Sequence, residues 1–107
     1  MAIRGCRDEH TEDFLAGKRV RAFDQCAKQA RKAIARLQAA ERLGDLRNPP
    51  GNIFKAIQPG RYSIRINRKW RVCFSWVPHH PAAAERIDPL MVAGEPDDVE
   101  ISNHYGD

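Results

Sequence analysis

The stretch YSIRINRKWRVCFSW, residues 62–76, carries the clearest structural signal in the chain. Every second residue in each half of it is apolar: Tyr62, Ile64 and Ile66 in the first half, and Trp70, Val72, Phe74 and Trp76 in the second. Successive side chains of a strand point to opposite faces, so this period of two predicts two antiparallel strands joined by a turn at 67–69. One face of the hairpin should be apolar and buried, and the other polar and basic.

A helical pattern lies upstream of the hairpin. Its apolar residues recur at steps of three and four and form one stripe: Cys26, Ala27, Ala30, Ala33, Ile34, Leu37 and Ala40. We expect a helix from an Asp24 cap to about Arg42, ended by Gly44, because the sequence NPPGN at 48–52 cannot continue a helix. The stripe should share one core with the apolar face of the hairpin: Ala30, Ile34, Leu37, Ile64, Ile66, Val72 and Phe74.

Shorter elements flank this helix and hairpin. We expect a strand at 3–6, a short helix that opens at Thr11 and closes at Gly17, and further strands at 54–57 and 99–101. One strand, two helices and then four strands predict an α+β fold, with a small antiparallel sheet and the two N-terminal helices packed on one face.

Residues 78–97 interrupt this pattern and form an inserted loop. They hold four of the seven prolines of the chain. Long loops without structure are uncommon in compact domains, so we expect either a projecting loop or a short helical turn near 82–86.

Composition predicts that residues 1–107 form one domain of a cytoplasmic protein. The chain is 42% hydrophobic and 30% charged, as globular proteins are. It has no apolar run near the roughly 20 residues that a membrane helix needs, and the first residues show no apolar signal region. Its three cysteines are widely spaced, which argues against a disulfide framework or a zinc ribbon and favours a reducing compartment.

The charges are divided unevenly along the chain. Residues 14–76 carry 15 Lys and Arg but only three Asp and Glu, whereas the two ends together are acidic. An excess of 12 positive charges in one block is typical of a surface that binds a polyanion. The alternative is a basic helix face that is simply solvated.

Four segments resemble a known family. They are LRNPPGN at 46–52, SIRIN at 63–67, WRVCF at 70–74 and DVEI at 98–101. Together they are similar to the HigB-type killer toxins of bacterial toxin–antitoxin (plasmid maintenance) systems, which belong to the RelE-like superfamily. The resemblance runs from about residue 3 to 105, apart from the insertion.

This resemblance implies a RelE-like fold and an activity. The family's toxins are endoribonucleases that cut messenger RNA on the translating ribosome and thereby inhibit translation, with no metal and no cofactor. A HigA-type helix-turn-helix antitoxin neutralises them, and they meet DNA only through that antitoxin.

Cleavage of RNA without a metal uses the RNA's own 2′-hydroxyl as nucleophile, so the protein must move protons and stabilise charge on the phosphate. Arg65 and Arg71 lie out of step with the apolar positions of their strands. We expect both to point to the open side of the sheet and to bind the scissile phosphate, since guanidinium groups grip phosphate oxygens with two donors. The alternative is that they are solvated strand arginines.

Three further basic residues are candidates for RNA binding. By resemblance, Lys55 occupies a position close to the catalytic face of the family, although a surface lysine without a role fits equally well. Arg68 and Lys69 lie at the expected hairpin tip, where contact with ribosomal RNA fits better than chemistry. The pair His79-His80 lacks further ligands at the usual spacing, so we expect no metal site.

The last residues depart from the family's pattern. Many relatives end in Asp-Tyr-His, whereas this chain has Asn103-His104-Tyr105. His104 is the candidate acid–base residue, Tyr105 can donate a hydrogen bond or stack on a base, and Asn103 can bind RNA but cannot act as a base.

This departure keeps a second hypothesis open, in which the chain is a catalytically weak or inactive module that binds ribosome or antitoxin. In a third hypothesis, the chain is a DNA-binding regulator, and only the basic helix would support it.

Overall fold

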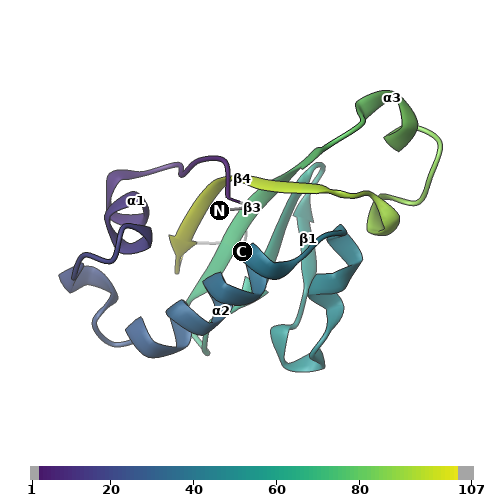
Figure 1. The fold of residues 1–107 in the computed structure, drawn as a ribbon. Coiled ribbons are helices and arrows are strands. Elements are labelled where there is room, and N and C mark those ends of the chain that lie inside the picture. The colour runs from purple at the N-terminus through teal and green to yellow at the C-terminus, as the bar shows by residue number, and fades with distance from the viewer. Residues whose placement is uncertain (1–2, 104–107) are drawn as a thin grey trace.

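Four antiparallel strands form one sheet in the order β1-β2-β3-β4 (Figure 1). Their bounds are Lys55–Gln58, Arg61–Arg65, Arg71–Pro78 and Gly94–Ser102. The computed structural model describes residues 3–103. Neighbouring strands are consecutive in the chain, so the sheet is a meander, and the α+β class with an antiparallel sheet is confirmed.

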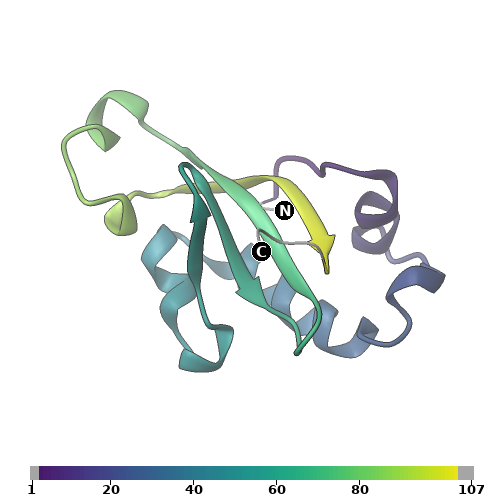
Figure 2. The same cartoon turned by 180° about the vertical axis from the view of Figure 1, so that it is seen from behind.

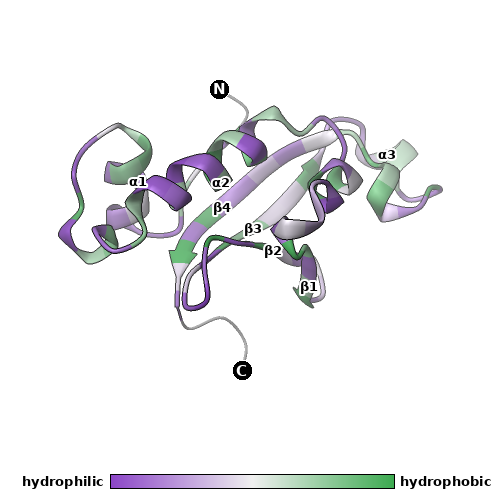
Figure 3. Cartoon of the chain, turned by 90° about the horizontal axis from the view of Figure 1, so that it is seen from below, coloured by the Kyte–Doolittle hydropathy of each residue, from purple (hydrophilic) through white to green (hydrophobic). Residues whose placement is uncertain are grey.

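The helices are α1 (Glu9–Leu15), α2 (Ala27–Ala39) and α3 (Pro81–Ala84). Short 3-10 turns lie at Arg21–Phe23, Leu43–Arg47, Pro50–Asn52 and Pro89–Met91. The long helix α2 crosses one face of the sheet, and α1 lies beside the end of β4 (Figures 1 and 2). Coloured by hydropathy, α2 carries both hydrophilic and hydrophobic residues, as expected of an amphipathic helix (Figure 3). None of the helices in 3–103 is long and apolar enough to cross a membrane.

The hairpin and the core are confirmed. β2 pairs with β3 in the register Ile64↔Val72 and Tyr62↔Phe74. All seven residues expected in one core are buried in a single cluster: Ala30, Ile34, Leu37, Ile64, Ile66, Val72 and Phe74. Trp70 and Trp76 pack at the edge of this cluster, so the alternation of side chains correctly identified the buried face.

The expected ends of α2 are wrong. The helix is preceded by Cys26, whereas Asp24 ends the 3-10 turn before it and accepts a hydrogen bond from Arg19 at 2.7 Å. The helix stops at Ala39, because the next residue adopts an extended conformation. Gly44 has another role: a Cβ there would lie 2.7 Å from the carbonyl oxygen of Leu90, so the glycine permits close approach of two turns.

The N-terminal segment also differs from the expectation. Residues 3–6 form no strand but only an isolated parallel bridge, Cys6↔Val99, beside β4. The cap of α1 is Asp8, whose carboxylate accepts from the backbone N–H of Thr11 at 2.9 Å. Thr11 is instead fully buried, and its hydroxyl oxygen accepts from the backbone N–H of Ile101 at 3.1 Å, which joins α1 to β4.

Residues 78–97 extend the pairing of β3 with β4 and do not form a separate inserted loop. β3 and β4 stay paired as far as Pro78↔Gly94, so residues 94–97 belong to β4. The helical turn expected near 82–86 is present as α3, which starts one residue and ends two residues earlier, at the tip that projects from the sheet in Figure 1. The indole N–H of Trp76 donates to the carbonyl oxygen of Val92 at 2.9 Å and ties the base of this projection together.

We predict that Leu37→Ala lowers the free energy of unfolding by about 2–5 kcal/mol, because this fully buried side chain leaves a cavity between α2 and the sheet. Urea unfolding followed by circular dichroism measures the change. The exposed Gln29 of the same helix supplies the control, since Gln29→Ala should shift stability by no more than about 0.5 kcal/mol. Equal effects of the two variants would contradict the packing of α2.

Candidate functional site

The face of the sheet that points away from α2 is polar. Strand pairing places two rows of side chains on it: Lys55, Ser63, Cys73 and Glu100 in one row, and Arg65, Arg71 and Ser102 in the next. Directly paired residues of antiparallel strands point to the same side. The residue pairing therefore brings Lys55, Arg65 and Arg71 to one face, seen in front of α2 in Figure 2.

Arg71 is on this face, but the expectation that it is exposed is wrong. Only 4% of its surface is accessible. Its Nε donates to Oγ of Ser63 at 2.7 Å, and its Nη2 donates to the carbonyl oxygens of Ser63, at 3.3 Å, and Ile53. Strand alternation sets the direction of a side chain but not its burial, and here the chain before β1 supplies a carbonyl partner.

This contact depends on an unusual backbone conformation. Ile53 has φ 43, in the left-handed region that a β-branched residue rarely adopts. The turn directs its carbonyl oxygen to Arg71, which thereby joins β3 both to β2 and to the segment before β1. Because this side chain holds three segments together, we expect loss of Arg71 to weaken the fold.

The other predicted basic residues lie at the same end of the sheet. Arg65 ends β2 directly opposite Arg71 and is partly exposed, and Lys55 begins β1 and is exposed. Arg68 and Lys69 are exposed in the turn between β2 and β3, where Oδ1 of Asn67 accepts from the backbone N–H groups of Lys69 and Trp70, each at 2.9 Å. The result is a positively charged end of the polar face.

The end of β4 reaches this same region. Ser102 is paired with Arg71, and the exposed Asn103 follows it. His104 and Tyr105, the remaining predicted site residues, lie outside the described residues. The topology thus leads the described part of the chain, at Asn103, to the basic end of the sheet.

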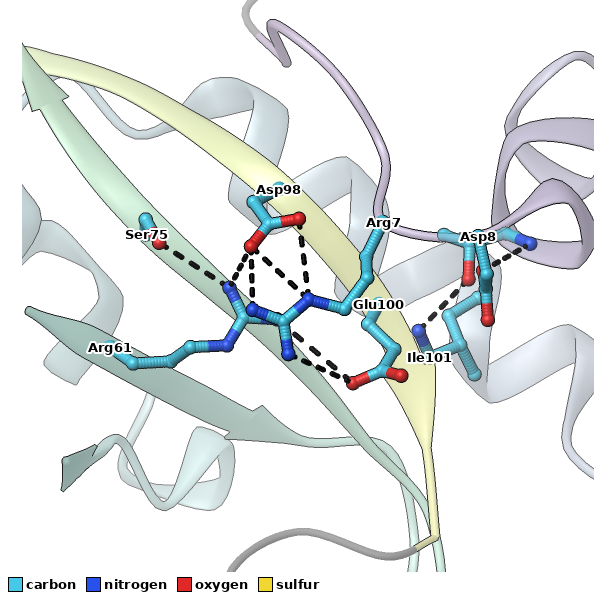
Figure 4. A network of polar contacts seen from close by, with 8 residues as sticks. Arg7, Asp8, Arg61, Ser75, Asp98, Glu100 and Ile101 are labelled. Carbon is cyan, nitrogen blue, oxygen red and sulfur yellow. Dashed lines mark hydrogen bonds and ion pairs between the residues drawn. The ribbon is translucent and has the colours of Figure 1, made fainter.

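A network of ion pairs on the same face was not predicted from the sequence (Figure 4). Asp98 accepts from Nη2 of Arg7 at 2.6 Å and from Nη1 of Arg61 at 3.3 Å, and Arg61 also donates to Oγ of Ser75 at 3.3 Å. Glu100 lies 4.0 Å from both guanidinium groups. Two arginines and two carboxylates balance, so this end of the face is close to neutral.

The network holds a strained residue. Asp98 has φ 51 and lies beside the irregularity in the β3–β4 pairing. The hydrogen bonds from Arg7 hold the pKa of the Asp98 carboxyl below its usual range, so the carboxylate is charged at neutral pH and the contact persists. Arg7, Arg61 and Asp98 lie far apart in the sequence, and nothing in their spacing indicates that they meet.

Cys73 lies between the two charged regions, and its thiol is not suited to nucleophilic attack. It is 2% exposed. Burial raises the pKa of the thiol, so it stays protonated near neutral pH. Within 3–103, no three His, Cys, Asp or Glu side chains are grouped as a metal site would need. His79 lies near Glu95, with 3.6 Å between Nε2 and Oε1.

We predict that Arg71→Ala lowers the free energy of unfolding by about 2–4 kcal/mol, because it removes the buried hydrogen bonds that this side chain donates to Ser63 and Ile53. Thermal and urea unfolding measure the loss. Arg68→Ala, at the exposed turn, is the control that removes the same charge. A melting temperature of Arg71→Ala equal to that of the control would show that these contacts contribute nothing to stability.

We also predict that Asp98→Asn removes a pH-dependent part of the stability. The folded pKa of Asp98 is lowered, so its contribution is present above the unfolded value of about 4 and is lost as the pH falls through the folded value. Because its side chain is 39% exposed, the contribution should be below about 1 kcal/mol. Unfolding measured from pH 7 to pH 3 should show wild type and variant converging, whereas Glu85→Gln, at an exposed position, should track wild type throughout.

Comparisons with known proteins agree with this architecture. A family model described as "RelE-like toxin of type II toxin-antitoxin system HigB" matches residues 7–89. Over 44 residues the chain is 46% identical to Toxin HigB-1 of Vibrio cholerae serotype O1 (strain ATCC 39315 / El Tor Inaba N16961), a stretch that covers 38% of this chain and 46% of that relative. Since the family match extends over most of the chain and ends within the projecting hairpin, the protein belongs to the HigB-like family of RelE-like toxins.

Proposed function

We propose that this toxin is a metal-independent endoribonuclease that cleaves messenger RNA on the ribosome and so inhibits translation. The observation that carries the proposal is the basic end of the polar face, where Arg65 lies opposite Arg71 and Lys55 begins the adjacent strand. Clustered cations beside the end of β4 fit the binding of an RNA phosphate.

Arg65 is the residue best placed to touch the substrate. It is partly exposed on the open face, and its guanidinium can donate two hydrogen bonds to a phosphate. Arg71 lies beside it with a side chain held by Ser63 and Ile53. A positive charge fixed before the reaction stabilises negative charge that develops on the phosphate without a cost of reorganisation.

The remaining roles in cleavage and RNA binding are assigned to the other predicted site residues. We assign proton transfer to His104, with Tyr105 donating a hydrogen bond or stacking on a base. Lys55 and Asn103 would hold the RNA beside the reacting phosphate. Arg68 and Lys69, in their exposed turn, would contact the RNA farther from the bond that is cleaved.

The partner that we propose is a HigA-type helix-turn-helix antitoxin in the cytoplasm. Family membership in a type II toxin–antitoxin system supports an antitoxin. An exposed cluster of cations binds nucleic acid with little selectivity at low salt, so a protein that covers it would prevent damage to RNA. Contact with DNA would then occur only through the antitoxin.

One residue favours a second candidate, a module that binds its partners but cleaves weakly. Asn103 stands where relatives carry an acid, and an amide cannot accept a proton. Induced expression separates the two candidates: growth arrest with fragmented messenger RNA that depends on His104 supports the nuclease, and arrest without fragments supports the module. A neighbouring gene for a helix-turn-helix protein would support the antitoxin.

We predict that Arg65→Ala slows cleavage of messenger RNA in a translating extract by about 30- to 1000-fold, as expected for loss of about 2–4 kcal/mol of transition-state stabilisation. The melting temperature should stay close to that of wild type, since the side chain is partly exposed. Arg86→Ala removes an equal charge from the exposed loop after α3 and should cleave at the wild-type rate. A folded Arg65→Ala protein with full activity would place the active site elsewhere.

A further inference from the structure

The outer face of α2 carries a second group of positive charges. Lys28, Lys32 and Arg36 are exposed and follow one another at steps of four residues, and Arg31 lies beside them. Steps of four place side chains on one side of a helix, about 6 Å apart along its axis. The helix contains no Asp or Glu. We call these four residues the α2 ladder.

The charges of the ladder repel one another and are not neutralised by nearby acids. Like charges four residues apart destabilise a helix. Within residues 3–103, the ion pairs involve neither Lys28 nor Lys32. The carboxylate of Asp45 accepts instead from backbone N–H groups. An anionic partner would relieve this repulsion, so the surface is suited to bind one.

Two members of the ladder are already held in place. The Arg31 guanidinium lies 4.1 Å from the centre of the Phe14 ring, and its Nη1 donates to the carbonyl oxygen of Phe14 at 3.3 Å. Nη1 of Arg36 donates to Oδ1 of Asn52 at 3.1 Å. Side chains that are fixed before binding lose less conformational entropy when a partner arrives.

The ladder cannot serve the proposed cleavage site directly. α2 packs on the apolar face of the sheet, whereas Arg65 and Lys55 lie on the opposite face (Figures 1 and 2). The molecule is 23–24 Å across in its two shorter dimensions. An RNA strand bound on the polar face therefore leaves the ladder free for another anionic surface.

The chemistry of the exposed positions favours a phosphate backbone over a protein. They hold four cations, two alanines and a glutamine: Lys28, Gln29, Arg31, Lys32, Ala35, Arg36 and Ala39. Stable protein interfaces depend on buried aromatic and large apolar side chains, and these positions contain none. Cations in a regular row, with one amide donor beside them, suit a nucleic-acid backbone.

We infer that the α2 ladder binds the phosphate backbone of double-helical RNA, as a second RNA contact on the side opposite the cleavage site. The choice of RNA over other polyphosphates rests on the proposed function. The toxin would then be held between two RNA surfaces, with folded RNA against α2 and the strand to be cut against the sheet.

The test compares two double variants that lose the same charge. Lys28→Gln with Lys32→Gln removes the free part of the ladder and spares its two anchored arginines. Arg4→Gln with Arg86→Gln removes two exposed arginines elsewhere. Binding to a fluorescent 20-base-pair RNA duplex, measured by anisotropy over a series of KCl concentrations, should weaken about tenfold for the first variant, and the slope of log K against log salt should fall by about two. The second variant should bind like wild type.

Three outcomes would overturn the inference. The first is equal weakening in both variants, and the second is a DNA duplex bound more tightly than the RNA duplex. The third is displacement of the duplex by poly-glutamate at equal charge concentration, which would indicate an acidic protein as partner.

Cleavage distinguishes this inference from the proposed function. Loss of duplex binding in a protein that never cleaves RNA supports the ladder but not the nuclease. Cleavage that depends on Arg65, with duplex binding unaffected by the ladder variant, supports the nuclease but not the ladder.

Discussion

The buried guanidinium of Arg71 organises the polar face of the sheet. It joins β3 to Ser63 of β2 and to the carbonyl of Ile53, just before β1. A buried charge is tolerated only where hydrogen bonds compensate for the water that it loses. The backbone of this region must therefore follow the path that supplies those bonds, and that path also sets where Lys55 and Arg65 lie.

The polar face has two regions that differ in whether their charges are paired. At one end, Arg7 and Arg61 are matched by Asp98 and Glu100, and the ion pairs hold the irregular part of β4. At the other end, the ion pairs found within residues 3–103 include none of the exposed residues Lys55, Arg68 and Lys69. Balanced charges stabilise a fold locally, whereas unbalanced exposed charges attract a polyanion, so the face divides into a structural half and a half suited to binding.

Much of the fold was predictable because its signals are local. Alternation over residues 62–76 identified the hairpin and its buried face, and the stripe from Ala30 to Leu37 identified the helix that covers it. The ends of elements were less predictable. Asp24 and Gly44 have the residue types of a cap and a stop, but their roles depend on Arg19 and Leu90, which the pattern of α2 does not include.

The sequence by itself determined the class of fold, the family and the direction in which the strand arginines point, because each depends on periodicity or on contiguous motifs. Only the tertiary structure decided which arginines are buried and which charges meet. Arg71 bonds to a carbonyl 18 positions away, and Arg7 pairs with a carboxylate 91 positions away. It also divided one basic block between two opposite faces. Contacts of this kind depend on how distant segments pack, and no local pattern encodes them.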